Sequence, residues 1–400
     1  MFKLKRFFLW LIAVSTFLII LLCGWIVYKL YFYNFPEENK LLSFTEWRKN
    51  FKKEKKHKVI SEHNSRTVES SYLLVDRIYK SMEGPMTAKE SFIETNFYNV
   101  ILSAVSPELL WITGYKVELF DDHNNRLSDD FMCHNNLNIG KNNILPWKLN
   151  TLGTDKRLFT LTEGQVELHL PDNYGIPILS NQRLRIDFQV LNHNLQKINL
   201  NVKQIVTIYY KYDNECNQQM KALYQQSAFI TKQVSGPIGN FNEVPYSMSD
   251  SVKNKYKDEV KLCCSNLSML SLKGYPFIDN YKREFTGHWT IDDSLETIST
   301  DVTPMLNLKY DTKIHFFSVH VHPFCQSLEL IDETNATSIF KANAINFTDK
   351  IGLKNISKKE SPEGVQLFKD HKYILTSIYN KTVPEKHTAM ATMFLYCEEK

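Results

Sequence analysis

The sequence predicts a mostly β protein, with two tandem antiparallel β-sandwich domains of jelly-roll-like type following an N-terminal transmembrane helix. An uncharged run of 22 residues, Phe7–Tyr28, is long enough to cross a bilayer core of about 30 Å as a helix. Beyond it, apolar and polar residues alternate in short segments that Asn, Asp, Gly and Pro separate, a pattern typical of half-buried strands. With 43% hydrophobic and 13% aromatic residues, the chain can fill about two cores.

The flanking charges of the apolar run predict its orientation. Lys3, Lys5 and Arg6 precede it, so the positive-inside rule places the N-terminus in the cytoplasm and the domains outside it, in a periplasm, a lumen or the extracellular space. The basic run Arg48–Lys58 favours the opposite orientation, but it lies about 20 residues away, where the rule weakens. We interpret this run as a solvated linker, with contact to anionic lipid headgroups as the alternative. The apolar run is too long for a signal peptide, so we expect a retained single-pass membrane anchor.

Charge and cysteine content narrow the function classes. Residues 1–58 hold twelve basic and four acidic residues, whereas residues 59–400 hold 36 basic and 40 acidic ones. The part that would bind ligands is therefore slightly acidic, which argues against nucleic acid as a partner. Six cysteines follow the anchor, an even number that fits disulfides in an oxidising compartment: Cys133, Cys216, Cys263, Cys264, Cys325 and Cys397.

Strand patterns cover most of the chain after the linker. The clearest is residues 197–210 (KINLNVKQIVTIYY), and the same alternation occurs in residues 165–170, 183–190 and 327–330. We expect local helices at Thr67–Ser81 and Glu215–Ile230. The predicted organisation is an anchor (1–33), a basic and helical juxtamembrane linker (34–84), an N-terminal sandwich (85–213), a connecting segment (214–270) and a C-terminal sandwich (271–400).

The chemistry-bearing residues that stand out are histidines. Common hydrolase, nucleotide-binding and zinc-protease motifs are absent from the sequence. In the run IHFFSVHVHPFC, His320 and His322 are two residues apart, so on a strand both imidazoles share a face and can reach one metal ion. His315 has the opposite parity and is not expected to join them. The alternative is that both are hydrogen-bonded strand histidines without a ligand.

A methionine-containing strand near the C-terminus adds soft donors. Met390 and Met393 have opposite strand parity, so at most one of them can face the histidines, and either is often simply a core residue. A thioether beside two imidazoles suits copper, especially Cu(I), better than zinc or iron. The sequence therefore predicts one copper site.

Three spaced elements resemble a known family. The order VHVH (His320, His322), then YILTSIYNKT (373–382), then AMATMFLYC is similar to the second catalytic domain of the copper type II, ascorbate-dependent monooxygenases, the family of peptidylglycine α-hydroxylating monooxygenase and dopamine β-hydroxylase. The resemblance implies that His320, His322 and Met390 bind the copper that activates dioxygen. It also implies that Tyr379 and Asn380 form the tyrosine-asparagine pair that supports this site.

The resemblance is fainter in the first half of the chain. The family carries a second, electron-transfer copper there on three histidines, and the corresponding positions here hold His134 and His193. Asn135 stands where the family has an adjacent histidine, and Asn binds copper poorly. Cys133, Met132 or the distant His288 are the candidates for completing this second site, and a structural role for His134 is the alternative.

The resemblance implies a membrane-anchored copper-dependent monooxygenase that hydroxylates a C–H bond of a small-molecule or peptide substrate, using dioxygen and ascorbate or a similar reductant. The alternative is a non-catalytic copper-binding or interaction module of the same fold, which the incomplete second site favours. A structural scaffold whose histidines serve only the core is the third interpretation.

Overall fold

A computed structural model describes the chain in two compact units. The first comprises residues 1–60 and 144–149, and the second comprises residues 61–143 and 150–400. The residues whose structure is described are 43–55, 72–74, 78–80, 97–101, 107–121, 123–140, 145, 147, 157–190, 193–194, 199–216, 220–236, 277–278, 283–291 and 294–399. The predicted anchor, residues 1–33, lies outside them. Among the described residues, no helix is both long enough and apolar enough to span a membrane.

The first unit contains helix α2 (Phe44–Lys55), within the predicted linker. Ser43 and Glu46 form a capping box: the Glu46 N–H donates to Ser43 Oγ (3.3 Å), and the Ser43 N–H donates to Glu46 Oε2 (3.2 Å). The helix buries Phe44 against Trp147, with ring centroids 5.1 Å apart. This aromatic contact ties the helix to the short segment around residue 147.

The second unit is mostly β, which confirms the predicted class. Its strands form six sheets among the described residues. The largest sheet runs in the order β1 (Tyr72–Leu74), β11 (Lys203–Tyr212), β4 (Leu109–Phe120), β8 (Tyr174–Leu179), β12 (Lys221–Phe229), β25 (Ala391–Glu398), β18 (Thr312–Val321) and β22 (Lys359–Leu367), with β7 (Glu167–His169) paired to β4.

The remaining strands form one five-stranded, one four-stranded and three smaller sheets. The five-stranded sheet has the order β17 (Leu295–Asp301), β23 (Tyr373–Asn380), β19 (Cys325–Asp332), β20 (Thr337–Asn346) and β21 (Leu353–Ile356). The four-stranded sheet has the order β3 (Phe97–Ile101), β9 (Arg183–Val190), β5 (Met132–Ile139) and β6 (Arg157–Thr162). The others are β10 (Asn199–Asn201) with β2 (Ile78–Lys80), β13 (Lys232–Ser235) with β15 (Glu284–Thr286) and β14 (Phe277–Ile278), and β16 (Trp289–Thr290) with β24 (Thr388–Ala389).

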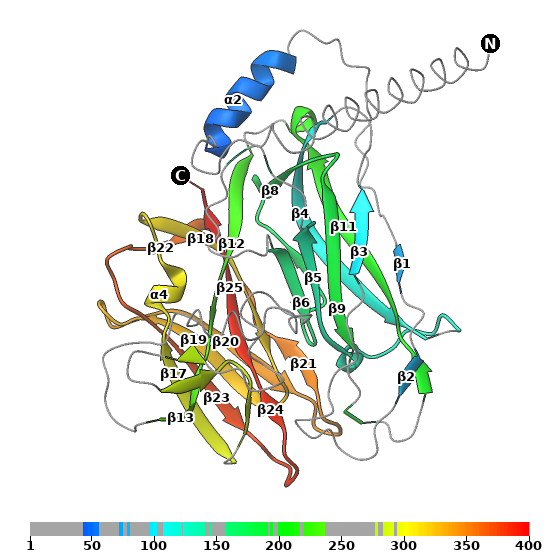
Figure 1. The fold of residues 1–400 in the computed structure, drawn as a ribbon, viewed down its shortest axis with the longest axis vertical. Helices are drawn as coiled ribbons and strands as arrows, with labels where there is room; N and C mark the ends of the chain where they lie inside the picture. The colour runs from blue at the N-terminus through cyan, green and yellow to red at the C-terminus, as the bar shows by residue number, and fades with distance from the viewer. Residues whose placement is uncertain are drawn as a thin grey trace, which may run out of the picture. The chain divides into compact units, whose positions relative to one another are not determined.

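The largest sheet joins the two predicted halves of the chain. Figure 1 shows β12, β25 and β18 side by side, and the ladder registers agree. β12 also pairs with β8 in parallel, at Lys221↔Tyr174 and Ala222↔Gly175, whereas the other ladders described are antiparallel. Backbone hydrogen bonds therefore run without interruption from strands near residue 110 to strands near residue 395.

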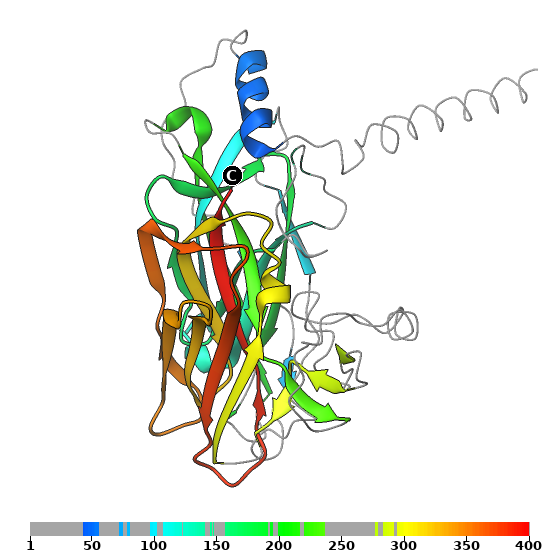
Figure 2. The same ribbon diagram turned by 90° about the vertical axis from the view of Figure 1, so that its left-hand side faces the viewer.

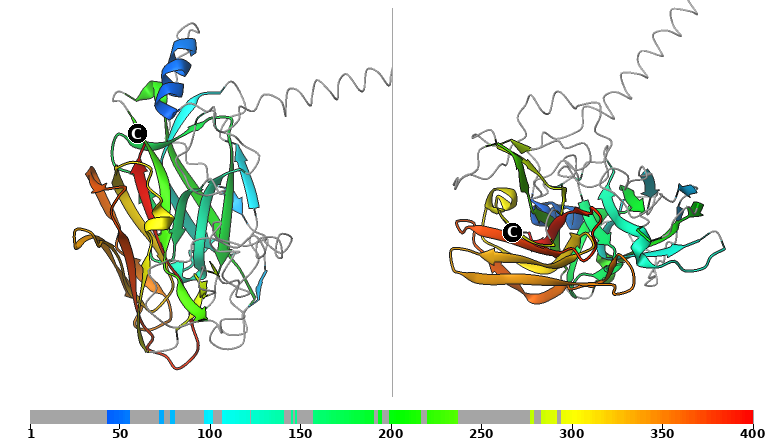
Figure 3. Two further views of the ribbon diagram at one scale, coloured as in Figure 1. Left: turned by 60° about the vertical axis from the view of Figure 1, so that its left-hand side comes forward. Right: turned by 90° about the horizontal axis from the view of Figure 1, so that it is seen from below.

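One face of β18 and β25 belongs to the large hydrophobic core of the C-terminal half. Val319, Val321 and Met393 are buried in it, together with residues of the five-stranded sheet such as Leu328 and Leu375. Figure 2 and the left panel of Figure 3 show the strands of residues 295–399 (yellow to red) gathered beside the cyan and green strands of the N-terminal half. The opposite face of β18 and β25 contacts the four-stranded sheet, where the rings of Phe159 and Tyr396 are 5.6 Å apart.

The strands predicted from alternating apolar and polar residues are present, and the two predicted local helices are not. β9 confirms the strand predicted at residues 183–190, and the strand predicted at residues 197–210 is divided into β10 and β11. The helix predicted at Glu215–Ile230 is wrong, because β12 occupies it between β8 and β25, and its flanking ladders supply the backbone hydrogen bonds that a helix would make internally. The helix predicted at Thr67–Ser81 is wrong too, since β1 and β2 lie there.

The disulfide expectation fails for the described cysteines. None of the four that the structure describes forms a disulfide: Cys133, Cys216, Cys325 and Cys397. The Sγ atoms of Cys325 and Cys397 face backbone carbonyls of their own strands, Ser327 and Leu395. Burial raises the pKa of both of these thiols to about 12, so both stay protonated. Cys263 and Cys264 lie outside the described residues.

Candidate metal centre

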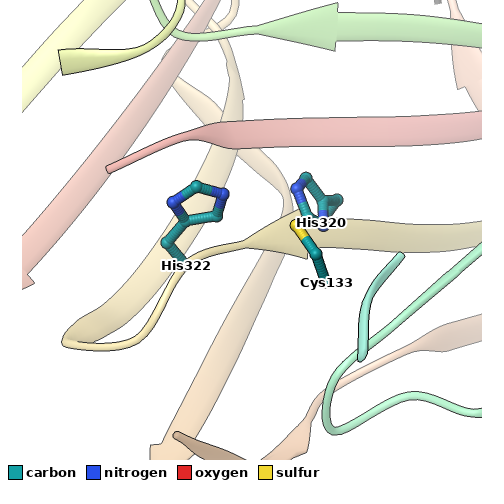
Figure 4. Close-up of side chains that lie close together, drawn as sticks. All are labelled: Cys133, His320 and His322. Atoms are coloured by element: carbon teal, nitrogen blue, oxygen red, sulfur yellow. The ribbon is translucent and has the colours of Figure 1, made fainter. Parts of the chain in front are cut away.

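His320 and His322 project from the same face at the end of β18. Both are buried, 3% and 7% exposed, and Figure 4 shows their imidazoles on one side of the strand. The intervening Val321 points into the hydrophobic core, as strand alternation requires. His315 lies elsewhere: its Nδ1 donates to the Ser361 carbonyl at 3.0 Å, and its Nε2 lies 3.0 Å from Glu398 Oε2.

A tight turn ends β18 directly after His322. The Cys325 N–H donates to the His322 carbonyl at 3.3 Å, and Pro323 cannot donate to a continuing ladder. Phe324 has φ of 73°, a left-handed conformation that bulky residues rarely adopt. Its backbone is held on both sides, because its N–H donates to Asn346 Oδ1 (2.6 Å) and its carbonyl accepts from the Asn380 N–H (2.9 Å). Strain of this kind, fixed by surrounding contacts, is common at functional sites.

Cys133 completes a three-residue donor group with these histidines. The candidate ligand atoms of Cys133, His320 and His322 all lie within 4.8 Å of one another, and all three residues are buried. Figure 4 shows the Cys133 sulfur beside the His320 ring. Thiolate and imidazole bind zinc or copper at about 2.0–2.3 Å, so small side-chain rotations bring the three atoms around one ion.

A β-bulge places Cys133 at the site. The β5–β9 register shifts between Met132 and His134, so Cys133 has no direct partner in the ladder. Adjacent strand residues normally point to opposite faces, but His134 also comes close to the site, with its ring centroid 5.8 Å from that of His320. Asn136 Nδ2 lies 3.0 Å from His134 Nδ1 and donates to it, which occupies that lone pair. Cys133 is therefore the better donor of the two.

His288 lies next to His322. Its Nε2 lies 3.4 Å from His322 Nε2, close to the separation of about 3.3 Å that two nitrogens have on one tetrahedral ion. Thr286 holds the turn that presents it: its Oγ1 donates to the His288 carbonyl (2.7 Å) and accepts from the His288 N–H (3.1 Å). His288 is thus a neighbour of His322 at this centre, beside the three-residue donor group.

The strand register puts Met390 on the histidine face. In the β18–β25 ladder, His320 pairs with Thr392 and Val321 pairs with Ala391. The His322 N–H donates to the Met390 carbonyl at 3.2 Å, so His322 and Met390 form the next pair. Directly opposite residues of an antiparallel pair project to the same face. Met393 pairs with Val319 and lies in the core.

Tyr379 is attached to the site through the backbone, and Asn380 is not. The Tyr379 hydroxyl donates to the Met390 carbonyl (2.6 Å) and accepts from the His322 N–H (3.3 Å). Asn380 is exposed, and its backbone N–H bonds the Phe324 carbonyl. Of the predicted tyrosine-asparagine pair, Tyr379 therefore fixes the backbone of the site, whereas Asn380 fixes the neighbouring turn.

His320, His322 and His288 are neutral. Burial, with the neighbouring histidines acting in the same direction, lowers the pKa of His320 and of His288 well below its usual range. Burial also lowers the pKa of His322 to about 4. His322 Nδ1 lies 3.1 Å from the Thr388 carbonyl and must donate to it, which leaves the lone pair of Nε2 for a metal. Neutral imidazoles are the form that binds metals.

Orphaned nitrogens indicate that the residues fit a metal ion. Neither ring nitrogen of His320 has a hydrogen-bond partner among the described residues, although both are fully buried. An unsatisfied buried polar group costs about 1–3 kcal/mol, and coordination to an ion would remove that cost. The chemistry of the donor set, two imidazoles and a thiol with a thioether nearby, suits copper or zinc.

His134 and His193, predicted as one second site, contact different histidines. His134 lies against His320, whereas the ring centroid of His193 lies 6.4 Å from that of His387. Sequence reasoning named Cys133 and His288 only as options for this second site and did not single out His387. A strand bulge brings Cys133 to the cluster, and segments distant in the sequence from His320 bring His288 and His387.

Comparisons with known proteins identify no family. No family model matches the chain, and no curated protein matches it. A solved structure titled "Crystal Structure of the STIV MCP" is 8% identical, with 82% of this chain and 96% of that chain covered and a TM-score of 0.23. One titled "PBCV-1 virus capsid, quasi-atomic model" is 7% identical, with 85% and 97% covered and a TM-score of 0.21. Scores this low carry no argument about fold or function.

Proposed function

We propose that this protein is a copper-binding protein whose centre is Cys133, His320 and His322. One observation carries the proposal: these three donors, from β5 and from the end of β18, lie within 4.8 Å of one another in the interior. They are 4%, 3% and 7% exposed. Nothing in the hydrophobic core requires a thiol and two imidazoles to converge there, and the unsatisfied nitrogens of His320 destabilise the fold without an ion.

The donor set favours copper. A thiolate with two imidazoles and a weak thioether is the set of copper electron-transfer centres, and thiolate and thioether donors select Cu(I). Met390, on the His322 side of the ladder, is the thioether in this proposal. Zinc also binds Cys and His donors, so it is the competing ion. The copper would supply one-electron redox chemistry, while the chain sets the donor positions and excludes water.

The finer architecture belongs to the same proposal. We take the four-stranded sheet and the strands facing it as one jelly-roll-like sandwich, and the C-terminal strands as a second, both on the extracytoplasmic side of an N-terminal anchor. Because Cys133 belongs to the first and His320 to the second, copper would hold the two together. In this view the protein handles or relays copper in that compartment.

Copper-dependent hydroxylation is the second candidate, and a cavity favours it. A cavity of about 850 Å³, large enough for a small substrate, is lined by Phe324, Asn194 and the loop around Phe347. The Phe324 ring is 4.9 Å from that of His387, so the cavity lies near the histidine cluster. Against this function, a thiolate ligand beside activated oxygen is open to oxidation, which is why simple copper binding is the main proposal.

The copper proposal is tested by loading the full-length chain in mild detergent. After chelator treatment, Cu(I) is titrated anaerobically against a competing chelator, and bound copper is measured by atomic absorption. We expect Cys133→Ser and His320→Gln each to lose one bound ion. The matched controls are Cys397→Ser, a buried thiol in the core, and His315→Gln, a buried histidine of β18. Unchanged copper in both site variants contradicts the proposal, and displacement by equimolar zinc contradicts the choice of metal.

The hydroxylation candidate needs a separate assay. Copper-loaded protein with ascorbate is followed by an oxygen electrode while small peptides and phenethylamines are added as probes. Oxygen consumption that depends on a probe and disappears in Met390→Leu supports hydroxylation. Consumption that is identical with and without every probe leaves copper binding as the function.

A further inference from the structure

A second pair of histidines meets outside the Cys133 centre. His193, which follows β9, and His387, which precedes β24, have ring centroids 6.4 Å apart with an interplanar angle of 52°. Two imidazoles that bind one ion from opposite sides have centroids about 6 Å apart, given metal–nitrogen bonds of about 2.0 Å. The pair therefore has the separation of a two-coordinate site before any rearrangement.

Neighbouring hydrogen bonds hold both histidines in place. Asn194, next to His193, donates to the Ile351 carbonyl (2.8 Å) and to Asp130 Oδ2 (3.0 Å), and its Oδ1 accepts from the Ile351 N–H (2.9 Å). On the other side, the His387 carbonyl accepts from the Ile291 N–H at 2.9 Å. These contacts fix the side chain of Asn194 and the backbone of His387, and none of them uses an imidazole.

Three of the four ring nitrogens of this pair have no hydrogen-bond partner in the part of the chain that the structure describes. Both ring nitrogens of His193 and the Nε2 of His387 are buried without a hydrogen-bond partner among the described residues. Burial lowers the pKa of His193 to about 3, with His387 and His322 acting in the same direction, so a proton does not fill the gap at neutral pH. The remaining candidates for these lone pairs are a water molecule and a metal ion.

We propose that His193 and His387 bind a second metal ion, Cu(I), separate from the ion at Cys133, His320 and His322. Monovalent copper is stable with two imidazole donors, whereas divalent ions require more ligands. Asp130, whose charge acts on His193, is already bonded to Lys350 Nζ (2.7 Å) and to Asn194, so it does not supply a hard oxygen ligand. This keeps the donor set soft and neutral.

The cavity gives this second ion a route to solvent. Asn194, the next residue after His193, lines this cavity. Phe324, whose ring contacts the ring of His387, lines it too. His322 also acts electrostatically on His193, so the pair lies near the inner centre as well as near the cavity. The arrangement is that of an entry position from which copper passes to the deeper ligands.

Stoichiometry tests the proposal on the full-length chain. Anaerobic Cu(I) titration against a chelator is expected to give two ions for the wild type and one for His387→Gln. The variant His387→Cys restores a soft donor and is expected to bind two again. The control His371→Gln alters a histidine bonded to Asp332 and should keep two. Circular dichroism before titration verifies that each variant is folded.

The outcomes separate the two proposals. Two ions in the wild type and in His387→Gln would overturn the second site and leave the Cys133 centre standing. The wild type could instead bind a single ion that is lost in Cys133→Ser and kept in His387→Gln. This result would also overturn the second site, and water would then lie between His193 and His387. A single ion that only His387→Gln removes would overturn the Cys133 centre instead. Stopped-flow mixing measures the rate at which copper reaches Cys133. A slower rate in His387→Gln than in the wild type would support the entry role.

Discussion

The Tyr379 hydroxyl donates a 2.6 Å hydrogen bond to the carbonyl of Met390. The same oxygen accepts from the backbone N–H of His322, so one phenol bridges two strands that carry proposed ligands. Burial raises the pKa of this phenol well above its usual range, so the hydroxyl keeps its proton and its role as donor. Tyr379 thus fixes the distance between the end of β18 and the start of β25.

Replacing Tyr379 by Phe should weaken copper binding as well as stability. The change leaves a buried carbonyl without its donor, which costs about 1–3 kcal/mol, and frees the backbone at both ligands, which lowers metal affinity by roughly 10–100-fold. Tyr373→Phe is the control. Tyr373 lies on the same strand and bridges the N–H and carbonyl of Phe368 (2.7 and 2.9 Å), away from the site. Equal copper affinities of the two variants would contradict the positioning role.

Replacing Met390 by Leu should reduce Cu(I) affinity by about tenfold while changing the free energy of unfolding little. The substitution keeps volume and removes the thioether, which is a weak axial donor in copper sites. Met393→Leu alters the neighbouring methionine that faces the core, and its copper affinity should equal that of the wild type. The measurement is a chelator competition titration. If both variants bind alike, Met390 is only a packing residue.

Glu163→Gln should stabilise the protein at high pH. Glu163 is buried, and desolvation raises the pKa of its carboxyl well above its usual range, although it accepts from the Leu353 N–H at 2.6 Å. A raised pKa in the folded state favours folding below about pH 4.5, and this contribution is lost as pH rises through the folded-state pKa. Urea unfolding at pH 5 and pH 8 should show a gain for the variant that is larger at pH 8 by more than about 1.4 kcal/mol. Glu118→Gln, at a partly exposed ion pair with Lys116, is the control.

Gly352→Ala should destabilise the fold by about 1–3 kcal/mol. Gly352 has φ of 149°, and a Cβ there would meet the Glu163 carboxylate and the Cβ of Asp130. Gly287→Ala is the matched control, because the nearest atom to its Cβ is a Phe229 ring carbon at 3.4 Å, an ordinary contact. Thermal unfolding of both variants is the measurement. Equal midpoints would show that the loop at Gly352 relaxes without cost.

The sequence predicted those parts of the site that depend on local periodicity. His320 and His322 share a face because strand alternation is a local rule, and β9 matches its predicted bounds, Arg183–Val190, for the same reason. The helix predicted over β12 failed because its partners, β8 and β25, are distant in the sequence. Cys133 reaches the centre only through a bulge, which depends on pairing with β9 and leaves no mark on the residue pattern.

The pairing of β12 with β25 also determines when the proposed metal centre could form. β12 ends at Phe229 and β25 begins at Ala391, so more than 160 residues must be synthesised before this ladder closes. Until then β12 has an open edge, which is a place for wrong pairing or aggregation. Copper loading at the proposed ligands His322 and Met390 would therefore follow the synthesis of β25.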